Sequence, residues 1–263
     1  TRALDLLDDE HADLRVTLRV QRADMSMQLG ELKEATDELL EVAEQAAELG
    51  RTEVEAEALL LLGDIDQRQG RPTDAHRRLL RAEELAGSTD DARLRTRAAF
   101  VMNSFVVDYL GEDLEQPIEN LRAAIATAEA LGDHALAAEG HLRIAAPLMG
   151  HDFAAAESEL RRCLELADDL GSHRIEAEGT SWLGAVAYYR NRPEEDERLC
   201  LQARTWFERT GDSYFQVQNL VLCLATFALG DGRAEEGEKW LREALPIAQI
   251  GRASCRERVC LLV

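Results

Sequence analysis

Apolar residues recur along this chain with the spacing of amphipathic helices. Downstream of Gly30 they follow one another at intervals of three or four residues, a spacing that traces one face of a helix, and a glycine suited to a helix end follows them. The residues of this stripe are Leu32, Ala35, Leu39, Val42, Ala43, Ala46 and Leu49, with Gly50 next. We expect the stripe to be buried against a neighbouring helix.

The stripe returns twice at fixed distances along the chain. Shifted by 82 residues it reads Leu114, Pro117, Leu121, Ala124, Ile125, Ala128 and Leu131, and shifted by 121 it reads Phe153, Ala156, Leu160, Cys163, Leu164, Ala167 and Leu170. A proline in the second copy is compatible with the first turn of a helix. Weaker copies contain Ala75, Leu79, Ala82 and Ala86, and Leu241, Ala244, Leu245 and Ala248. The two shifts are two and three multiples of a period near 40 residues.

A second helix is expected before each stripe, joined to it by a tight turn. Residues that tolerate a left-handed backbone recur at the same period, at Gly30, Gly70, Gly111, Gly150, Asn191 and Gly232. One hairpin of two helices is too small to bury its own apolar face, whereas stacked hairpins share a continuous core. The sequence therefore predicts an all-α solenoid of about six antiparallel helix-turn-helix repeats.

Composition agrees with this fold and disfavours two classes of partner. The chain has 263 residues, only 17 glycines and 5 prolines, and an aromatic content of 5%. No run approaches eighteen consecutive apolar residues, so we expect no membrane span. The formal net charge of −21 works against direct nucleic-acid binding, which needs clustered lysine and arginine.

The C-terminal stretch differs in style from the rest. "IGRASCRERV" (250–259) places three arginines in an acidic chain and resembles the in-frame translation of a common sequencing-library adapter, ATC GGA AGA GCG TCG TGT AGG GAA AGA GTG. We expect residues 250–263 to be non-biological. Residues 1–249 are then the helical repeat domain, a fragment that we expect to be truncated at both ends.

The remaining cysteines, Cys163, Cys200 and Cys223, have no CxxC spacing and are odd in number. This favours a reducing, cytoplasmic location. Lys33 and Lys239 are the only lysines, and the resulting arginine bias is typical of a high-GC bacterial genome.

The repeat resembles a known family. It carries "LG" before the turn, at Leu62–Gly63 and Leu183–Gly184, and an alanine five residues after the turn glycine, as in Gly70 and Ala75. These features resemble the tetratricopeptide repeat. The long period is similar to that of the repeat regions of MalT-like (LuxR-type) bacterial regulators. The resemblance covers nearly all of residues 9–249.

One segment, "DLGSHRIEAEG" (169–179), could be mistaken for an active site. In sibling repeats the position of His173 is held by His134, Thr52 and Ser213, where an N-cap is useful, so we interpret the histidines as cap or loop residues. The sequence contains no HExxH, CxxC, GxxxxGK[ST] or strand-linked GxGxxG motif. We therefore expect no catalytic residue, no cofactor and no metal, and a protein that is not an enzyme.

Two clusters remain as candidates for binding. In "WLGAVAYYRNR" (182–192) we expect Trp182 and one tyrosine to fill the core and the other tyrosine to face a groove. The resemblance further implies a concave surface formed by first-helix residues. By register, these candidates are Asp64, Gln67, Arg68, Asp108, Tyr109, Glu178, Ser181, Tyr188 and Asn219.

The sequence thus favours a non-catalytic interaction or effector-sensing segment of a larger bacterial regulator. Its expected partner is a protein or peptide segment, or a small-molecule effector, in the concave groove. Uncapped terminal repeats also predict some self-association. Two alternatives stay open: a regulatory tail of an enzyme such as a nucleotide cyclase or kinase, and a free-standing adaptor.

Overall fold

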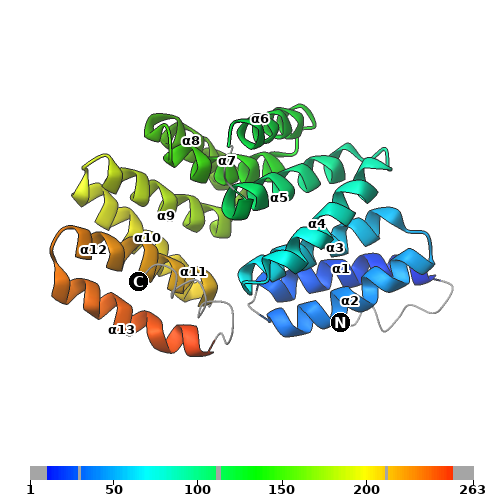
Figure 1. Cartoon of the computed structure of the whole chain (residues 1–263), viewed down its shortest axis with the longest axis horizontal. Helices are drawn as coiled ribbons and strands as arrows, with labels where there is room; N and C mark the ends of the chain where they lie inside the picture. Colours follow the sequence, from blue (N-terminus) through cyan, green and yellow to red (C-terminus); the bar gives the residue numbers. More distant parts are fainter. Residues whose placement is uncertain (1–10, 29–30, 111–113, 211–212, 251–263) are drawn as a thin grey trace. The chain divides into compact units, whose positions relative to one another are not determined.

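The computed structural model describes residues 11–28, 31–110, 114–210 and 213–250. These residues are helical apart from short turns, and this part of the chain contains no strand. The chain divides into two compact units, Thr1–Tyr109 and Leu110–Val263, which are treated separately below. Figure 1 shows the helices of each unit following one another as antiparallel neighbours. The predicted all-α repeat fold is confirmed.

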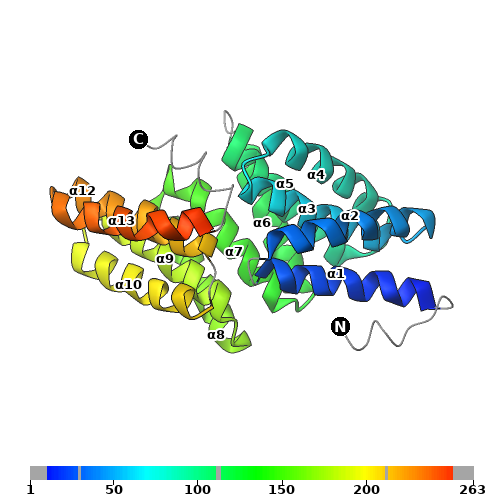
Figure 2. The same ribbon diagram turned by 90° about the horizontal axis from the view of Figure 1, so that it is seen from below.

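The first unit holds five helices: α1 (Ala12–Gln28), α2 (Leu32–Glu48), α3 (Thr52–Arg68), α4 (Pro72–Gly87) and α5 (Ala92–Leu110). Figure 2 shows α1, α2 and α3 side by side. Because α3 contributes Leu62 to a core with α1 and α2 and Leu60 to a core with α4 and α5, it is buried on two sides. This double burial is what makes consecutive hairpins one stack.

The second unit continues the pattern. Its helices are α6 (Glu115–Ala130), α7 (His134–Met149), α8 (Phe153–Leu170), α9 (His173–Tyr189), α10 (Pro193–Thr210), α11 (Ser213–Gln218), α12 (Thr226–Gly230) and α13 (Ala234–Ile250). A π-helical segment, η3 (Asn219–Ala225), joins α11 to α12, so the three form one helical stretch that packs on α13. The periodicity predicts a helix here but not the π-helical turn.

The predicted hairpin turns are confirmed at three positions. Gly70, Asn191 and Gly232 have φ values of 68°, 58° and 77°, in the left-handed region. Gly150 differs, with φ of −74°, because its turn is closed by short-range hydrogen bonds such as Asp152 N to Leu148 O (2.7 Å), which need no left-handed residue. Gly30 and Gly111 lie outside the described residues.

The apolar stripes are buried as predicted, except at their ends. Ala35, Leu39, Val42 and Ala46 are fully buried, as are their counterparts in the middle of α6 and α8. The last leucine of each stripe, Leu49, Leu131 or Leu170, is 44–48% exposed, because the helix ends there and the chain turns away. In α13, Leu241 and Leu245 are also exposed, whereas Ala244 and Trp240 are buried.

The "LG" glycines occupy close contacts between the two helices of a hairpin. A Cβ atom on Gly63 would lie 2.5 Å from Leu79 Cδ2, and one on Gly184 would lie 2.6 Å from Cys200 Sγ. The two contacts are in the same register, sixteen residues apart in each hairpin. Glycine suits the packing here, since a larger residue requires the facing side chain or one helix to shift.

The N-cap interpretation needs correction. Helix α3 begins at Thr52 and its N-cap is Arg51, with no side-chain cap hydrogen bond. In α7 the cap is Asp133, whose Oδ1 accepts from Leu136 N at 3.0 Å. His134 and His173 are accordingly the first residues of their helices, one position beyond the cap. Ser213 likewise begins α11, and the residue before it lies outside the described part.

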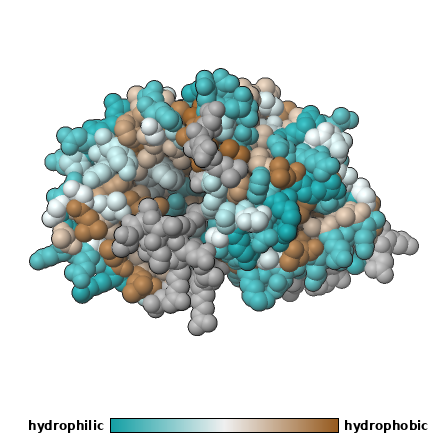
Figure 3. Space-filling view, viewed as in Figure 1, coloured by the Kyte–Doolittle hydropathy of each residue, from teal (hydrophilic) through white to brown (hydrophobic). Residues whose placement is uncertain are grey.

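The surface is predominantly polar. In the view of Figure 3, hydrophobic residues are scattered among hydrophilic ones, and single exposed apolar side chains are normal for folded proteins. By length and composition, one described helical stretch, Ser213–Gly230, is apolar enough to cross a membrane. Since 56% of it is buried inside the second unit, it also has the character of a core helix.

Candidate binding site

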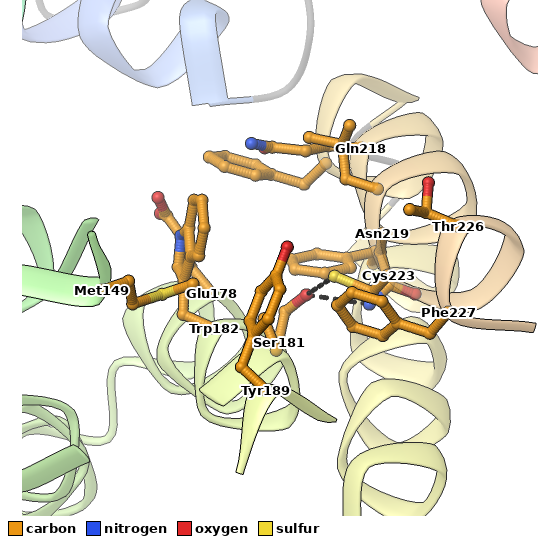
Figure 4. A pocket seen from close by; sticks show the side chains of 14 residues that line it. Met149, Glu178, Ser181, Trp182, Tyr189, Gln218, Asn219, Cys223, Thr226 and Phe227 are labelled. Atoms are coloured by element: carbon orange, nitrogen blue, oxygen red, sulfur yellow. Dashed lines mark hydrogen bonds between the residues drawn. The ribbon is translucent and has the colours of Figure 1, made fainter. Parts of the chain in front are cut away.

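A cavity of about 290 Å³ lies in the second unit between α9 and the stretch formed by α11, η3 and α12. Residues of α7 and α10 complete its wall. Figure 4 shows the side chains of α9 rising into it from one side and those of η3 facing them. Its lining is mainly apolar and aromatic, and includes Met149, Trp182, Ala185, Tyr189, Phe207, Phe215, Leu222 and Phe227.

The α9 wall follows from helical geometry. Glu178, Trp182, Ala185 and Tyr189 are spaced by four, three and four residues, so they share one face of the helix. That face is the one turned to the cavity. Tyr189 is 55% exposed and stacks on Phe153, at 5.4 Å between ring centroids. The α9 wall thus has an acidic end at Glu178 and an aromatic end at Tyr189.

The opposite wall contains the π-helical segment. Asn219 Nδ2 donates to Ser181 Oγ at 2.9 Å, and Ser181 Oγ lies 3.5 Å from Cys223 Sγ. Both bonds connect η3 to α9 across the floor of the cavity. A π-helical turn changes which side chains face a neighbouring helix, and such turns are frequent at functional sites. Here it places Asn219 and Cys223 together on the cavity side.

Behind this floor lies a buried thiol and carboxyl group. Cys200 Sγ donates to Asp196 Oδ1 at 3.2 Å. Its hydrogen bond with Cys223, followed by burial, raises the pKa of the Cys200 thiol. Burial raises the pKa of Asp196 to about 6, and burial raises that of Cys163 to about 12. Cys200 and Cys163 are therefore protonated at neutral pH and behave as core residues.

Among the described residues that line the cavity, Glu178 is the only one of the acidic and basic types Asp, Glu, Lys and Arg. Its Oε2 accepts from Arg174 Nη1 at 3.2 Å, in an i,i+4 pair on α9. The two side chains are 19% and 37% exposed, respectively, so water reaches the pair. The carboxyl group of Glu178 therefore lies at the edge of an aromatic cavity, within reach of water.

The sequence candidates of the second unit fall in different places. Glu178, Ser181 and Asn219 are brought together in the cavity lining. Tyr188 is not in the lining, because it stacks on Phe227 with centroids 4.0 Å apart. Burial raises its pKa. Tyr189 lines the cavity instead. Of the two tyrosines, Tyr188 is therefore the one that packs inside, and Tyr189 is the one that faces the cavity.

The described candidates of the first unit contact one another in two pairs. Arg68 Nη2 pairs with Asp64 Oδ2 at 3.0 Å. The Tyr109 hydroxyl donates to the backbone oxygen of Gln67 at 3.2 Å, and Gln67 is itself buried. Asp108 belongs to α5, but its side chain lies outside the described part. Whether these residues form a groove stays a prediction.

The main residues missed by the sequence reasoning are aromatic. Trp182 packs against the core cluster as expected, but it also lines the cavity, as do Phe207, Phe215 and Phe227. A signal for Trp182 and Tyr189 was present, because both continue the face of α9 that begins at Glu178. The phenylalanines carried no such signal, since their exposure depends on how α10, α11 and α12 pack.

In the residues that the structure describes, no three His, Cys, Asp or Glu side chains are grouped as a metal ion requires. His173 instead stacks on Trp206, with centroids 4.4 Å apart, and its Nδ1 lies 3.3 Å from Glu176 Oε2.

No protein-family model matches the chain, and no curated protein matches its sequence. Solved structures do match its fold. A Rap protein complexed with Competence and Sporulation Factor has a TM-score of 0.66 at 11% identity, covering 90% of this chain and 75% of that one. The apo form of RapI has a TM-score of 0.58 at 12% identity, covering 88% and 97%.

A third similar structure contains a repeat sensor. It is a signal transduction ATPase with numerous domains (STAND) from Pyrococcus horikoshii, which has a tetratricopeptide repeat sensor. Its TM-score is 0.54 at 16% identity, with 90% of this chain and 36% of that one covered. The fold of the chain is therefore that of tetratricopeptide-like repeat proteins, as the repeat pattern predicted.

Proposed function

We propose that this chain is a non-catalytic binding module that holds a segment of a partner protein in the cavity of its second unit. The observation that carries the proposal is the cavity itself, an apolar and aromatic hollow with a few polar groups at its floor and edge. At about 290 Å³ it is at the lower end of ligand pockets, a size suited to one or two side chains or to a small effector.

The structural neighbours support the same class of function. One of them is a Rap protein complexed with Competence and Sporulation Factor, and another uses its tetratricopeptide repeats as a sensor. We further propose a cytoplasmic bacterial regulator of the MalT-like type as the parent protein. Genomic sequence upstream of the codon for Thr1 tests this: an ATPase domain supports a regulator, a cyclase or kinase domain supports an enzyme tail, and a start codon supports an adaptor.

Selection of a displayed random peptide library on the immobilised chain tests the binding function. We expect selected peptides to lose about tenfold in affinity, or about 1.4 kcal/mol, on Phe215→Ala, because aromatic anchors carry much of the energy of such sites. Leu131→Ala, which removes an exposed side chain of the same unit, is the control and should change nothing. Peptides that bind both variants as tightly as the wild type would place the binding surface elsewhere.

A further inference from the structure

The cavity combines features that do not suit every ligand equally. Its walls carry aromatic rings, and its edge carries one carboxylate, that of Glu178. A purely apolar side chain entering the cavity would remove water from Glu178 without replacing it, which is costly for a charged group. An anionic side chain would be repelled by Glu178 and by a chain of net charge −21.

We propose, resting on the function above, that the cavity accepts the side chain of an arginine or lysine of the partner segment. The apolar stem of such a side chain would lie against Trp182, Met149 and Phe215, and the cationic head would lie near Glu178 and the aromatic rings. A cation over an aromatic face is attracted by the ring, more strongly when it is desolvated than when it is exposed. Figure 4 shows Glu178, Trp182 and Tyr189 on the same wall.

The ion pair of Glu178 with Arg174 does not prevent this. Arg174 reaches Glu178 along the surface of α9, and an i,i+4 pair that water reaches is weak. Arg174 is not part of the cavity lining. A carboxylate offers about four lone-pair sites on its two oxygens, so it accepts from several donors at once, and an incoming head group can bind Glu178 with its present partners in place.

A matched pair of small probes isolates the charge. Hexylammonium and 1-hexanol have the same stem and differ in the head group. We titrate each into the full-length chain and follow the indole N–H resonance of Trp182, identified with the variant W182F. Hexylammonium is expected to bind about tenfold more tightly than hexanol, a preference of about 1.4 kcal/mol, and to weaken as salt is raised.

Glu178→Gln is expected to abolish the preference for hexylammonium. Glu176→Gln is the matched control, because Glu176 is on the same helix, pairs with His173 and lies outside the lining. Equal or tighter binding of hexanol to the wild type overturns the inference, and this comparison needs no variant to fold. A preference that survives Glu178→Gln also overturns it.

Peptide binding tests the partner segment independently of the two small probes. Peptides selected on the wild-type chain should contain an arginine or lysine whose replacement by norleucine costs about tenfold on the wild type and nothing on Glu178→Gln. Selected peptides that bind without a basic residue overturn the inference but leave the binding function standing. Failure to select any peptide, with hexylammonium still bound at Trp182, overturns the partner-segment proposal alone.

Discussion

At the scale of single residues, the second unit depends on very close contacts beneath its cavity. Gly184 allows α9 to approach α10 so closely that a Cβ atom would lie 2.6 Å from Cys200 Sγ and 3.3 Å from Asp196 O. Cys200 in turn donates to the buried carboxyl of Asp196. Cys200 therefore connects the close packing of α9 on α10 with the buried, ionisable carboxyl group of Asp196.

Gly184→Ala should destabilise the protein by about 1–3 kcal/mol, because the added methyl group forces one helix or Cys200 to shift in a packed core. Urea unfolding followed by circular dichroism measures this. Gly87→Ala is the control, since a Cβ atom there meets nothing within 4 Å. If Gly184→Ala unfolds at the same urea concentration as the wild type, the close contact relaxes without a loss of stability.

Asp196 should make stability depend on pH. Burial raises its pKa to about 6 from the ordinary value of 3.8. The folded state then binds a proton more readily than the unfolded state, so the free energy of unfolding rises as pH falls from about 6 to about 4, by up to about 3 kcal/mol. Comparing wild type with Asp196→Asn over this range by urea unfolding isolates the contribution, since the asparagine lacks it.

The control for this comparison is Glu194→Gln, which removes an exposed acid from the first turn of the same helix. It should leave the pH dependence of the wild type intact. If Asp196→Asn and wild type change in parallel between pH 4 and pH 7, the carboxyl of Asp196 is not the group responsible.

At the scale of elements, a buried carboxylate connects α3 to α4 in the first unit. Asp66, near the end of α3, is fully buried and accepts from Arg71 Nε at 2.8 Å, in the turn that leads to α4. Its other oxygen lies 2.8 Å from Arg78 Nη1, on α4 itself. One side chain thus fixes the angle of a hairpin by contacting its turn and its second helix.

Asp66→Asn should therefore destabilise the protein by about 3 kcal/mol, because breaking a buried ion pair leaves uncompensated charge. The measurement is again urea unfolding. Asp74→Asn, which breaks an exposed pair with Arg77, is expected to cost less than about 1 kcal/mol. Equal costs for the two variants would mean that burial does not strengthen the Asp66 pairs.

At the scale of the whole molecule, the chain forms two compact units, each with its own buried clusters. In a repeat protein each element contacts mainly its neighbours, so stability is a sum of local terms. Perturbations in one unit should then remain within that unit.

Native-state hydrogen exchange tests this locality. Asp66→Asn is expected to increase exchange in α3 and α4 and to leave α9 and α10 protected, and Gly184→Ala is expected to do the reverse. A uniform increase along the chain for either variant would show that the two units unfold as one cooperative body.

The sequence alone determined the repeat. Apolar spacing within helices, the period near 40 residues and the turn residues are local properties, because the backbone geometry of a helix decides which positions share a face. That is why the hairpins, the buried centres of the stripes and the turns at Gly70, Asn191 and Gly232 were predictable. The exposed leucines at the stripe ends were not, since the apolar spacing does not show whether a neighbouring helix covers the last turn.

The cavity was decided by tertiary structure. Glu178, Ser181 and Asn219 were predictable from register. In contrast, Tyr189 lines the cavity where Tyr188 was expected, and the phenylalanine walls appeared only with the packing of α10, α11 and α12 around α9. The π-helical turn shifts side chains on one helix relative to its neighbour, and no period in the sequence marks it. A cavity is a place where packing leaves space, and that depends on all surrounding elements at once.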